Sequence, residues 1–169
     1  MLKKNLIIFL MLPSLFLSYC NKAVKPDAEQ DKIKIKAAIE NSIGWAFNKD
    51  KDLLYSVVAQ DSDFFIYHPD NNTIAGFENF KNLVETVFMD DGFKALRFEV
   101  KDLKITLSSL DKTAWFSCLL DDFGEFNGQP GGWENVRWTG VLEKREGNWT
   151  IVQMHFSYST EQINDEKNN

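Results

Sequence analysis

The sequence has little cysteine, little histidine and no excess of positive charge, and each shortage excludes a class of protein. Its 169 residues include two cysteines, Cys20 and Cys118, and two histidines, His68 and His155. The formal net charge is −6, so nucleic acids and anionic lipid headgroups are poor partners. No glycine-rich loop opens a helix, so no phosphate-binding loop is predicted. We find no internal repeat, and the length suits one domain.

The N-terminus carries a long apolar run that predicts export. Lys3 and Lys4 precede the run over residues 6–17, which is too short for a stable membrane-spanning helix. Residues 17–20 (LSYC) resemble the lipobox of bacterial lipoproteins, in which a peptidase cuts before a cysteine that then receives acyl chains. We therefore expect a signal peptide over 1–19 and a protein held through acylated Cys20 at a membrane of the bacterial cell envelope. An ordinary signal peptide or an uncleaved anchor is the alternative.

Acylation of Cys20 leaves Cys118 without a partner, so we expect no intramolecular disulfide. Cys118 lies in the apolar segment 115–120 (WFSCLL). We interpret it as a small buried hydrophobic residue. Loss of the two N-terminal lysines makes the mature chain more acidic still.

The mature chain predicts a single α+β domain over residues 31–158, after a polar tether over 20–30 and before a disordered tail over 159–169. Apolar residues at four-residue spacing predict a helix from Asp31, and Asp50 or Asp52 caps a shorter one. A third helix is expected over 77–88, with strands over 63–68, 73–75, 96–107, 113–122 and in the hairpin 133–157, and a flexible loop over 124–132. A shift of the apolar alternation at Asp102 predicts a β-bulge.

The hairpin carries a polar row and an apolar row on opposite faces. Gly147 supplies the turn of the hairpin. In each of the two strands that flank this turn, successive side chains point alternately to the two faces of the sheet. The polar row is Arg137, Thr139, Gln153, His155 and Ser157, and the apolar row is Trp138, Leu142, Val152, Met154 and Phe156. A polar row is either a solvated face or the lining of a pocket. The nearby tryptophans favour the pocket, so we expect the polar row to face inward and the apolar row to form a homodimer interface.

Several short segments together resemble the NTF2-like superfamily, in particular its SnoaL-like branch. They are 48–52 (NKDKD), 66–69 (IYHP), 74–78 (IAGFE), 114–116 (AWF), 137–141 (RWTGV) and 147–157 (GNWTIVQMHFS). The resemblance implies an NTF2-like, cystatin-like cone: a strongly curved antiparallel sheet wrapped around three N-terminal helices and open at one end onto an apolar cavity. Such domains commonly dimerise through the outer face of the sheet. The superfamily hosts many activities, so the fold does not fix the function.

The ketosteroid isomerases within that superfamily use residues that this chain lacks. Their general-base aspartate corresponds to His68 and their oxyanion-donating tyrosine to Gly44 or Trp45. Their buried, protonated aspartate corresponds to Val136 or Arg137. Steroid-isomerase chemistry is therefore not predicted.

Two functions remain open. The first is a binding module for a small apolar or aromatic organic ligand, in a cavity edged by tryptophans and a few polar groups. Its predicted ligand-binding residues are Trp45, Trp115, Asp121, Trp133, Thr139, Gln153 and Ser157. The second is an isomerase, dehydratase or cyclase with His68 or His155 as general acid or base and Arg137 stabilising negative charge.

The plainer alternative for both histidines is a structural hydrogen-bond network with Arg137. A metal site in which the histidines join Asp121 or Asp122 is weaker, because nothing in their spacing demands it. We therefore predict neither a metal nor a cofactor.

Overall fold

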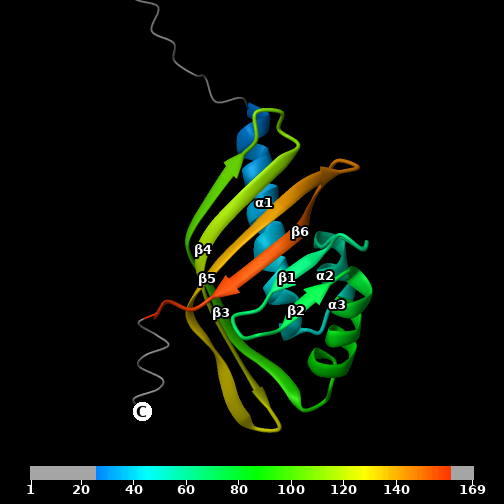
Figure 1. Cartoon of the computed structure of the whole chain (residues 1–169), viewed down its shortest axis with the longest axis vertical. Helices are drawn as coiled ribbons and strands as arrows, with labels where there is room; N and C mark the ends of the chain where they lie inside the picture. The colour runs from blue at the N-terminus through cyan, green and yellow to red at the C-terminus, as the bar shows by residue number, and fades with distance from the viewer. Residues whose placement is uncertain (1–25, 161–169) are drawn as a thin grey trace, which may run out of the picture.

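The structure, a computed structural model, describes residues 26–160, in which helices pack against one face of a curved sheet (Figure 1). The helices are α1 (Pro26–Gly44), α2 (Lys51–Val57) and α3 (Phe77–Leu83), with a 3-10 turn η1 (Trp45–Phe47) and a π-helical turn η2 (Val84–Phe88). The strands are β1 (Phe65–Tyr67), β2 (Thr73–Ala75), β3 (Phe93–Leu107), β4 (Thr113–Phe126), β5 (Gln129–Arg145) and β6 (Asn148–Ser157). The expected α+β class and cone fold are confirmed.

Helix α1 begins earlier than expected, because its first turn suits a helix start. Pro26 stands at the first position, where no backbone N–H is needed, and Asp27 and Glu29 add negative charge in the first turn. Residues 26–30, predicted as part of the tether, are therefore helical. The face of α1 with Ile35, Ala38 and Ile39 is buried in the core.

A polar contact ties α1 to the hairpin of β5 and β6. The buried Asp31 carboxylate accepts hydrogen bonds from Lys144 Nζ at 2.8 Å and from Trp149 Nε1 at 3.0 Å. Further along the chain, Lys49 takes a positive φ after η1. The predicted cap of α2 is confirmed, since the Asp50 side chain accepts a 2.9 Å hydrogen bond from Leu53 N. In the described part of the chain, no helix has the length and apolar character needed to cross a membrane.

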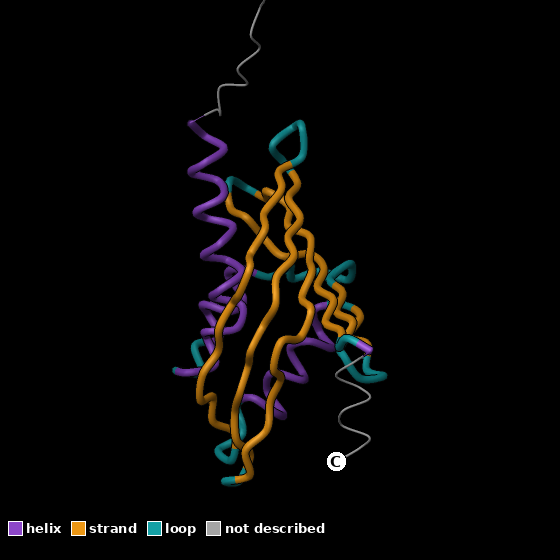
Figure 2. The backbone as a smooth tube through the Cα atoms, turned by 90° about the vertical axis from the view of Figure 1, so that its left-hand side faces the viewer, coloured by secondary structure: helices purple, strands orange, loops and turns teal. Residues whose placement is uncertain are grey.

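The sheet has the strand order β2-β1-β6-β5-β4-β3 and is mixed. Strand β1 lies parallel to β6, and the other pairs are antiparallel. The expectation of a wholly antiparallel sheet is therefore wrong at β1. The long strands twist and bend around the helices, which all lie on the concave side (Figure 2).

The bulge in β3 is confirmed, but the flexible loop over 124–132 is wrong. The register of β3 against β4 shifts between Lys101 and Lys104, where Asp102 has a φ of 54°. At the other end, β4 and β5 pair as far as Phe126 and Gln129. Asn127 and Gly128 form a two-residue turn with φ values of 50° and 77°, which suits the right-handed twist of paired strands.

The two rows of the final hairpin face opposite to the prediction. Trp138 and Leu142 of the apolar row are fully buried against the helices, with Met154 and Phe156 nearly so, whereas Arg137, Thr139 and His155 are exposed. The concave face of a sheet covered by helices must be apolar, and the other face meets solvent. The polar row therefore lies on the outer, convex face, and the homodimer interface predicted on the apolar row is wrong. Val152, next to a register shift between β5 and β6, is partly buried.

Candidate functional site

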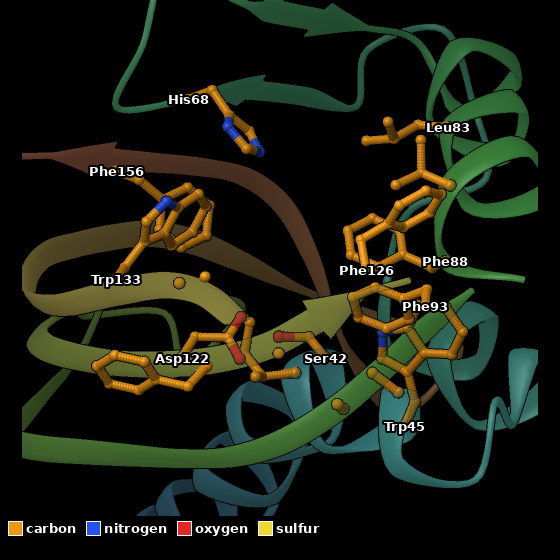
Figure 3. Close-up of a pocket in the computed structure, with 18 of the residues that line it drawn as sticks. Ser42, Trp45, His68, Leu83, Phe88, Phe93, Asp122, Phe126, Trp133 and Phe156 are labelled. Carbon is orange, nitrogen blue, oxygen red and sulfur yellow. The ribbon is translucent and has the colours of Figure 1, made fainter. Parts of the chain in front are cut away.

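A cavity of about 440 Å³ lies between the concave face of the sheet and the helices, at the end of the cone formed by η2 and the tip of β4 and β5 (Figure 3). This volume falls within the range of about 300 to 1,000 Å³ that is usual for small-molecule sites. The π-helical turn contributes Val87 and Phe88 to the lining. Single π-helical turns are frequent at functional sites.

Aromatic rings form a large part of the cavity wall. The Trp45 and Phe88 rings meet edge-on with their centroids 5.9 Å apart, and the Phe88 and Phe93 rings meet edge-on with their centroids 5.0 Å apart. On the other side, the rings of Trp133 and Phe156 lie 5.2 Å apart. Edge-to-face contacts of this kind hold aromatic side chains in fixed orientations, so the wall presents rigid ring faces and edges to a ligand.

Asp122 on β4 is an acidic group in this apolar surrounding. Burial raises the pKa of its carboxyl from 3.8 to about 6. Within residues 26–160, no hydrogen bond or ion pair to the Asp122 side chain is present. The carboxyl points into the cavity on the side opposite His68 (Figure 3). An unpartnered carboxyl in a cavity is available for a ligand or for proton transfer.

Ser42 of α1 lies on the same side of the cavity as Asp122 (Figure 3). The Ser42 side chain is buried, and its hydroxyl donates a 2.8 Å hydrogen bond to the carbonyl oxygen of Ile39. Because the hydroxyl proton is used within the helix, the Ser42 oxygen can offer only its lone pairs to a ligand.

His68 follows β1 and completes the polar lining. Its backbone N–H donates to Asn72 at 3.1 Å, and its ring meets the Trp133 ring edge-on at 5.0 Å. Burial lowers the pKa of His68, and the carboxylate of Asp70, 3.9 Å from Nδ1, only partly offsets that effect. His68 is therefore a neutral imidazole at pH 7, able to accept a proton on one nitrogen and to donate from the other.

The structure brings three of the sequence-predicted site residues to the cavity, namely Trp45, His68 and Trp133. The others lie elsewhere: Arg137, Thr139, Gln153, His155, Ser157 and Trp115 belong to the outer face of the sheet. The expectation that these six line the cavity is wrong, because the apolar residues of the strands occupy the helix-covered concave face and these six lie on the convex face. Arg137 and Thr139 instead edge a shallow outer groove of about 280 Å³ with Lys104 and Ser117.

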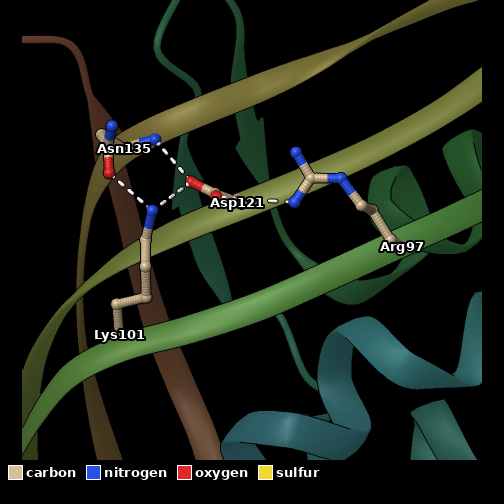
Figure 4. A network of polar contacts seen from close by, with 4 residues as sticks. All are labelled: Arg97, Lys101, Asp121 and Asn135. Carbon is tan, nitrogen blue, oxygen red and sulfur yellow. Dashed lines mark hydrogen bonds and ion pairs between the residues drawn. The ribbon is translucent and has the colours of Figure 1, made fainter.

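Asp121 is also outside the cavity, in a buried polar network beneath the outer face (Figure 4). Its carboxylate accepts hydrogen bonds from Lys101 Nζ at 2.6 Å and from the Asn135 backbone N–H at 2.8 Å, and Arg97 lies 3.6 Å away. Burial alone would raise the pKa of Asp121, but these partners hold it below the ordinary value. The predicted role of Asp121 in ligand binding is wrong, because its oxygens are already occupied.

The metal-site alternative is also wrong. His68 and Asp122 lie at the cavity, whereas His155 and Asp121 lie on the other side of the sheet. Across residues 26–160, no three His, Cys, Asp or Glu side chains come close enough together to hold a metal ion.

Asp122 and Ser42 line the cavity although neither was predicted there from the sequence, and for Asp122 the sequence does contain a signal. Ala114, Phe116, Cys118 and Leu120 alternate as a buried row along β4, and the same period continues to Asp122. An acidic residue in phase with an apolar row is a candidate for a cavity. Ser42 carries no such signal, since a serine on a helix is equally common at the surface.

Comparison with known proteins agrees with the geometry. The sequence model of a family described as "SnoaL-like domain" matches residues 35–161. None of the curated protein sequences compared with this chain matches it.

Three solved structures share the fold at low sequence identity. A candidate dehydratase of the NTF2-like family from Streptomyces avermitilis superimposes with a TM-score of 0.65 and 16% identity, covering 78% of this chain and 97% of that one. A candidate scytalone dehydratase from Novosphingobium aromaticivorans superimposes with a TM-score of 0.64 and 11% identity, covering 76% of this chain and 83% of that one. The association domain of C. elegans CaMKII superimposes with a TM-score of 0.59 and 15% identity, covering 79% of this chain and 100% of that one.

Proposed function

As the chain belongs to the SnoaL-like domain family, we propose that it binds a small apolar or aromatic organic molecule in the cone cavity. The observation that carries the proposal is a cavity of about 440 Å³ with aromatic walls and few polar groups. Such sites gain affinity from the burial of apolar ligand surface, and the polar groups orient the ligand.

The test is binding of a neutral apolar fluorophore, phenylnaphthylamine, together with native mass spectrometry of freshly purified protein for a retained ligand. Ala95 lines the cavity, so Ala95→Trp fills it and is expected to weaken fluorophore binding at least tenfold. The control is Ala37→Trp on the exposed face of α1, which leaves binding unchanged. Equal binding by both variants contradicts the proposal.

A second candidate function is acid–base catalysis of a dehydratase or isomerase type, and the opposed polar groups of the cavity favour it. Burial raises the pKa of Asp122 to about 6, a range that suits a general acid or base near neutral pH, and lowers the pKa of His68, which favours its neutral imidazole form. One group would remove a proton from a carbon of the substrate, and the other would donate a proton to the departing or rearranging oxygen. Two of the similar folds belong to candidate dehydratases.

Turnover of a panel of hydroxylated aromatic ketones tests this second function. Asp122→Asn and His68→Gln are each expected to lower kcat at least a hundredfold, as removal of a general acid or base does. His155→Gln on the outer face serves as the matched control and keeps full activity. Loss of turnover in the control as well contradicts the assignment.

We also propose that two copies associate through the outer face of the sheet. Tyr67 and Trp115 on that face are each 49% exposed. Exposed aromatic side chains are enriched at protein–protein interfaces. The similarity to an association domain supports the same proposal.

We further propose that the protein is exported and anchored to a membrane of the bacterial cell envelope through acylated Cys20. The residues concerned lie outside the described part of the chain, and the support is the lipobox-like sequence alone. Expression of full-length protein and of Cys20→Ser, followed by detergent phase separation, tests it. The parent protein is expected in the detergent phase and the variant in the aqueous phase, and identical partitioning contradicts the proposal.

A further inference from the structure

The charged groups of the cavity are of one sign. Asp122 and Glu125 line it, and of the described lining residues none is Lys or Arg. Glu125 already has a cation beside it, since Lys94 Nζ lies 3.8 Å from its carboxylate. Asp122 has no such partner, so any charge complementary to it must come from the ligand. A ligand anion at this site would meet a carboxyl with no counter-charge nearby.

The hydrogen-bonding groups around Asp122 point the same way. The Asp122 carboxylate can only accept hydrogen bonds, and the Ser42 hydroxyl already donates its one hydrogen bond to Ile39 O at 2.8 Å. Ser42 and Asp122 face the same part of the cavity (Figure 3). A ligand group seated there must therefore supply donors to two acceptors. An ammonium group has several N–H donors and no acceptor, whereas a hydroxyl has a single donor.

The remaining walls suit the rest of such a ligand. The rings of Trp45, Phe93 and Trp133 line the cavity, and aromatic faces attract cations as well as apolar groups. The neutral imidazole of His68 adds no repelling charge.

We propose that the ligand class is a hydrophobic amine, with its ammonium group held by the Asp122 carboxylate and the Ser42 oxygen and its apolar body against the aromatic wall. This inference rests on the proposed function, because it names the chemistry of the molecule that the cone cavity binds. Formation of the ion pair supplies Asp122 with the partner that the protein itself does not provide.

Isothermal titration calorimetry at pH 7.5 with three matched probes tests the inference: naphthylethylamine, the neutral naphthylethanol and the anionic naphthylacetate. The amine is expected to bind at least tenfold more tightly than the alcohol, and the anion more weakly than either. In Asp122→Asn the advantage of the amine over the alcohol is expected to disappear, while the alcohol keeps its affinity. Ser42→Ala is expected to reduce the same advantage a few-fold.

The control is Asp52→Asn, which removes an exposed carboxyl from α2 and leaves the preference for the amine intact. Circular dichroism confirms that each variant is folded before titration. If the alcohol or the anion binds as tightly as the amine, the amine inference is overturned and the cavity proposal stands. If none of the three probes binds, both the amine inference and the cavity proposal are overturned.

Discussion

Two adjacent carboxyl groups, Asp121 and Asp122, show how strongly the local surroundings decide the role of a residue. Successive side chains of a strand point to opposite faces. Asp121 lies under the outer face with Lys101 and Asn135 as partners, and its pKa is lowered. Asp122 lies on the cavity side, where burial raises its pKa to about 6. The first is a structural group, and the second is the group available for function.

Asp122 should destabilise the folded protein at neutral pH. Its folded pKa of about 6 exceeds the ordinary 3.8, so the folded state holds the proton more tightly and loses stability as pH rises across this interval. Asp122→Asn removes that effect. We expect the variant to be more stable than the parent above pH 6, by up to about 2 kcal/mol, and the difference to vanish below pH 4.

Urea unfolding of both proteins between pH 4 and pH 8 measures this difference directly. Subtraction of one curve from the other cancels the other titrating groups, among them His68. A difference that is constant with pH, or that grows toward low pH, contradicts the raised pKa.

Asp31 gives a prediction of the opposite sign. Asp31→Ala removes the acceptor for Lys144 and for the buried Trp149 indole, which is then left without a partner. We expect a loss of about 2 to 3 kcal/mol in the free energy of unfolding, measured by urea denaturation at pH 7. Asp27→Ala, an exposed carboxyl in the first turn of the same helix, should cost less than about 1 kcal/mol. Equal losses would remove the special role of Asp31.

At the scale of the element, the long hairpin of β5 and β6 determines the shape of the cone. Its turn at Glu146 and Gly147 has positive φ at both positions, as the two-residue turn of a twisted hairpin requires. Its inner row faces the helices, and at Gly140 the neighbouring strands β4 and β6 pack so closely that no side chain fits. A Cβ there would lie 2.5 Å from Phe116 Cε1 and 2.7 Å from the Gln153 carbonyl oxygen.

Gly140→Ala is therefore expected to destabilise the protein by about 1 to 3 kcal/mol, since the Phe116 ring or the backbone of β6 must move. Gly131→Ala in the same strand is the matched control, because a Cβ at that position meets nothing within 4 Å. The control should change stability by no more than about 0.5 kcal/mol. Thermal unfolding of both variants measures the effect, and similar melting temperatures would show that the sheet adapts at Gly140 without cost.

At the scale of the whole molecule, the curved sheet separates two surfaces of different character. The concave side holds the core and the cavity, and the convex side presents the polar row together with Tyr67 and Trp115. Tyr67 pairs in register with His155, which pairs with Thr139, which in turn pairs with Ser117. These residues therefore form one continuous band across the outer face, next to Trp115.

If this face joins two copies, a charge at its centre should separate them. We expect Trp115→Asp to shift the protein from dimer to monomer in sedimentation velocity experiments, with at least a tenfold rise in the dissociation constant. Leu110→Asp, at a turn residue that is 78% exposed, should leave the dimer intact. A parent protein that sediments as a monomer at millimolar concentration contradicts the interface.

The sequence by itself determined most of the elements and the family. Four-residue spacing of isoleucines marks α1, Asp50 marks the start of α2, and the broken alternation at Asp102 marks the bulge of β3. Each of these features depends on local geometry, namely the period of a helix, a capping hydrogen bond or the alternation of a strand. The same alternation correctly placed Arg137, Thr139 and His155 on one face together.

Only the tertiary structure decided which face that was. Alternation divides a strand into two rows but does not say which row meets the helices, and here the apolar row with Trp138 faces the core. Asp121 and Asp122 are indistinguishable by composition, and the partners of Asp121 come from β3 and β5, at distant positions in the chain. The cavity likewise arises where residues of α1, η1, α3, η2 and all six strands converge. Long-range packing sets these contacts, so the site follows from the assembled cone and not from any one segment.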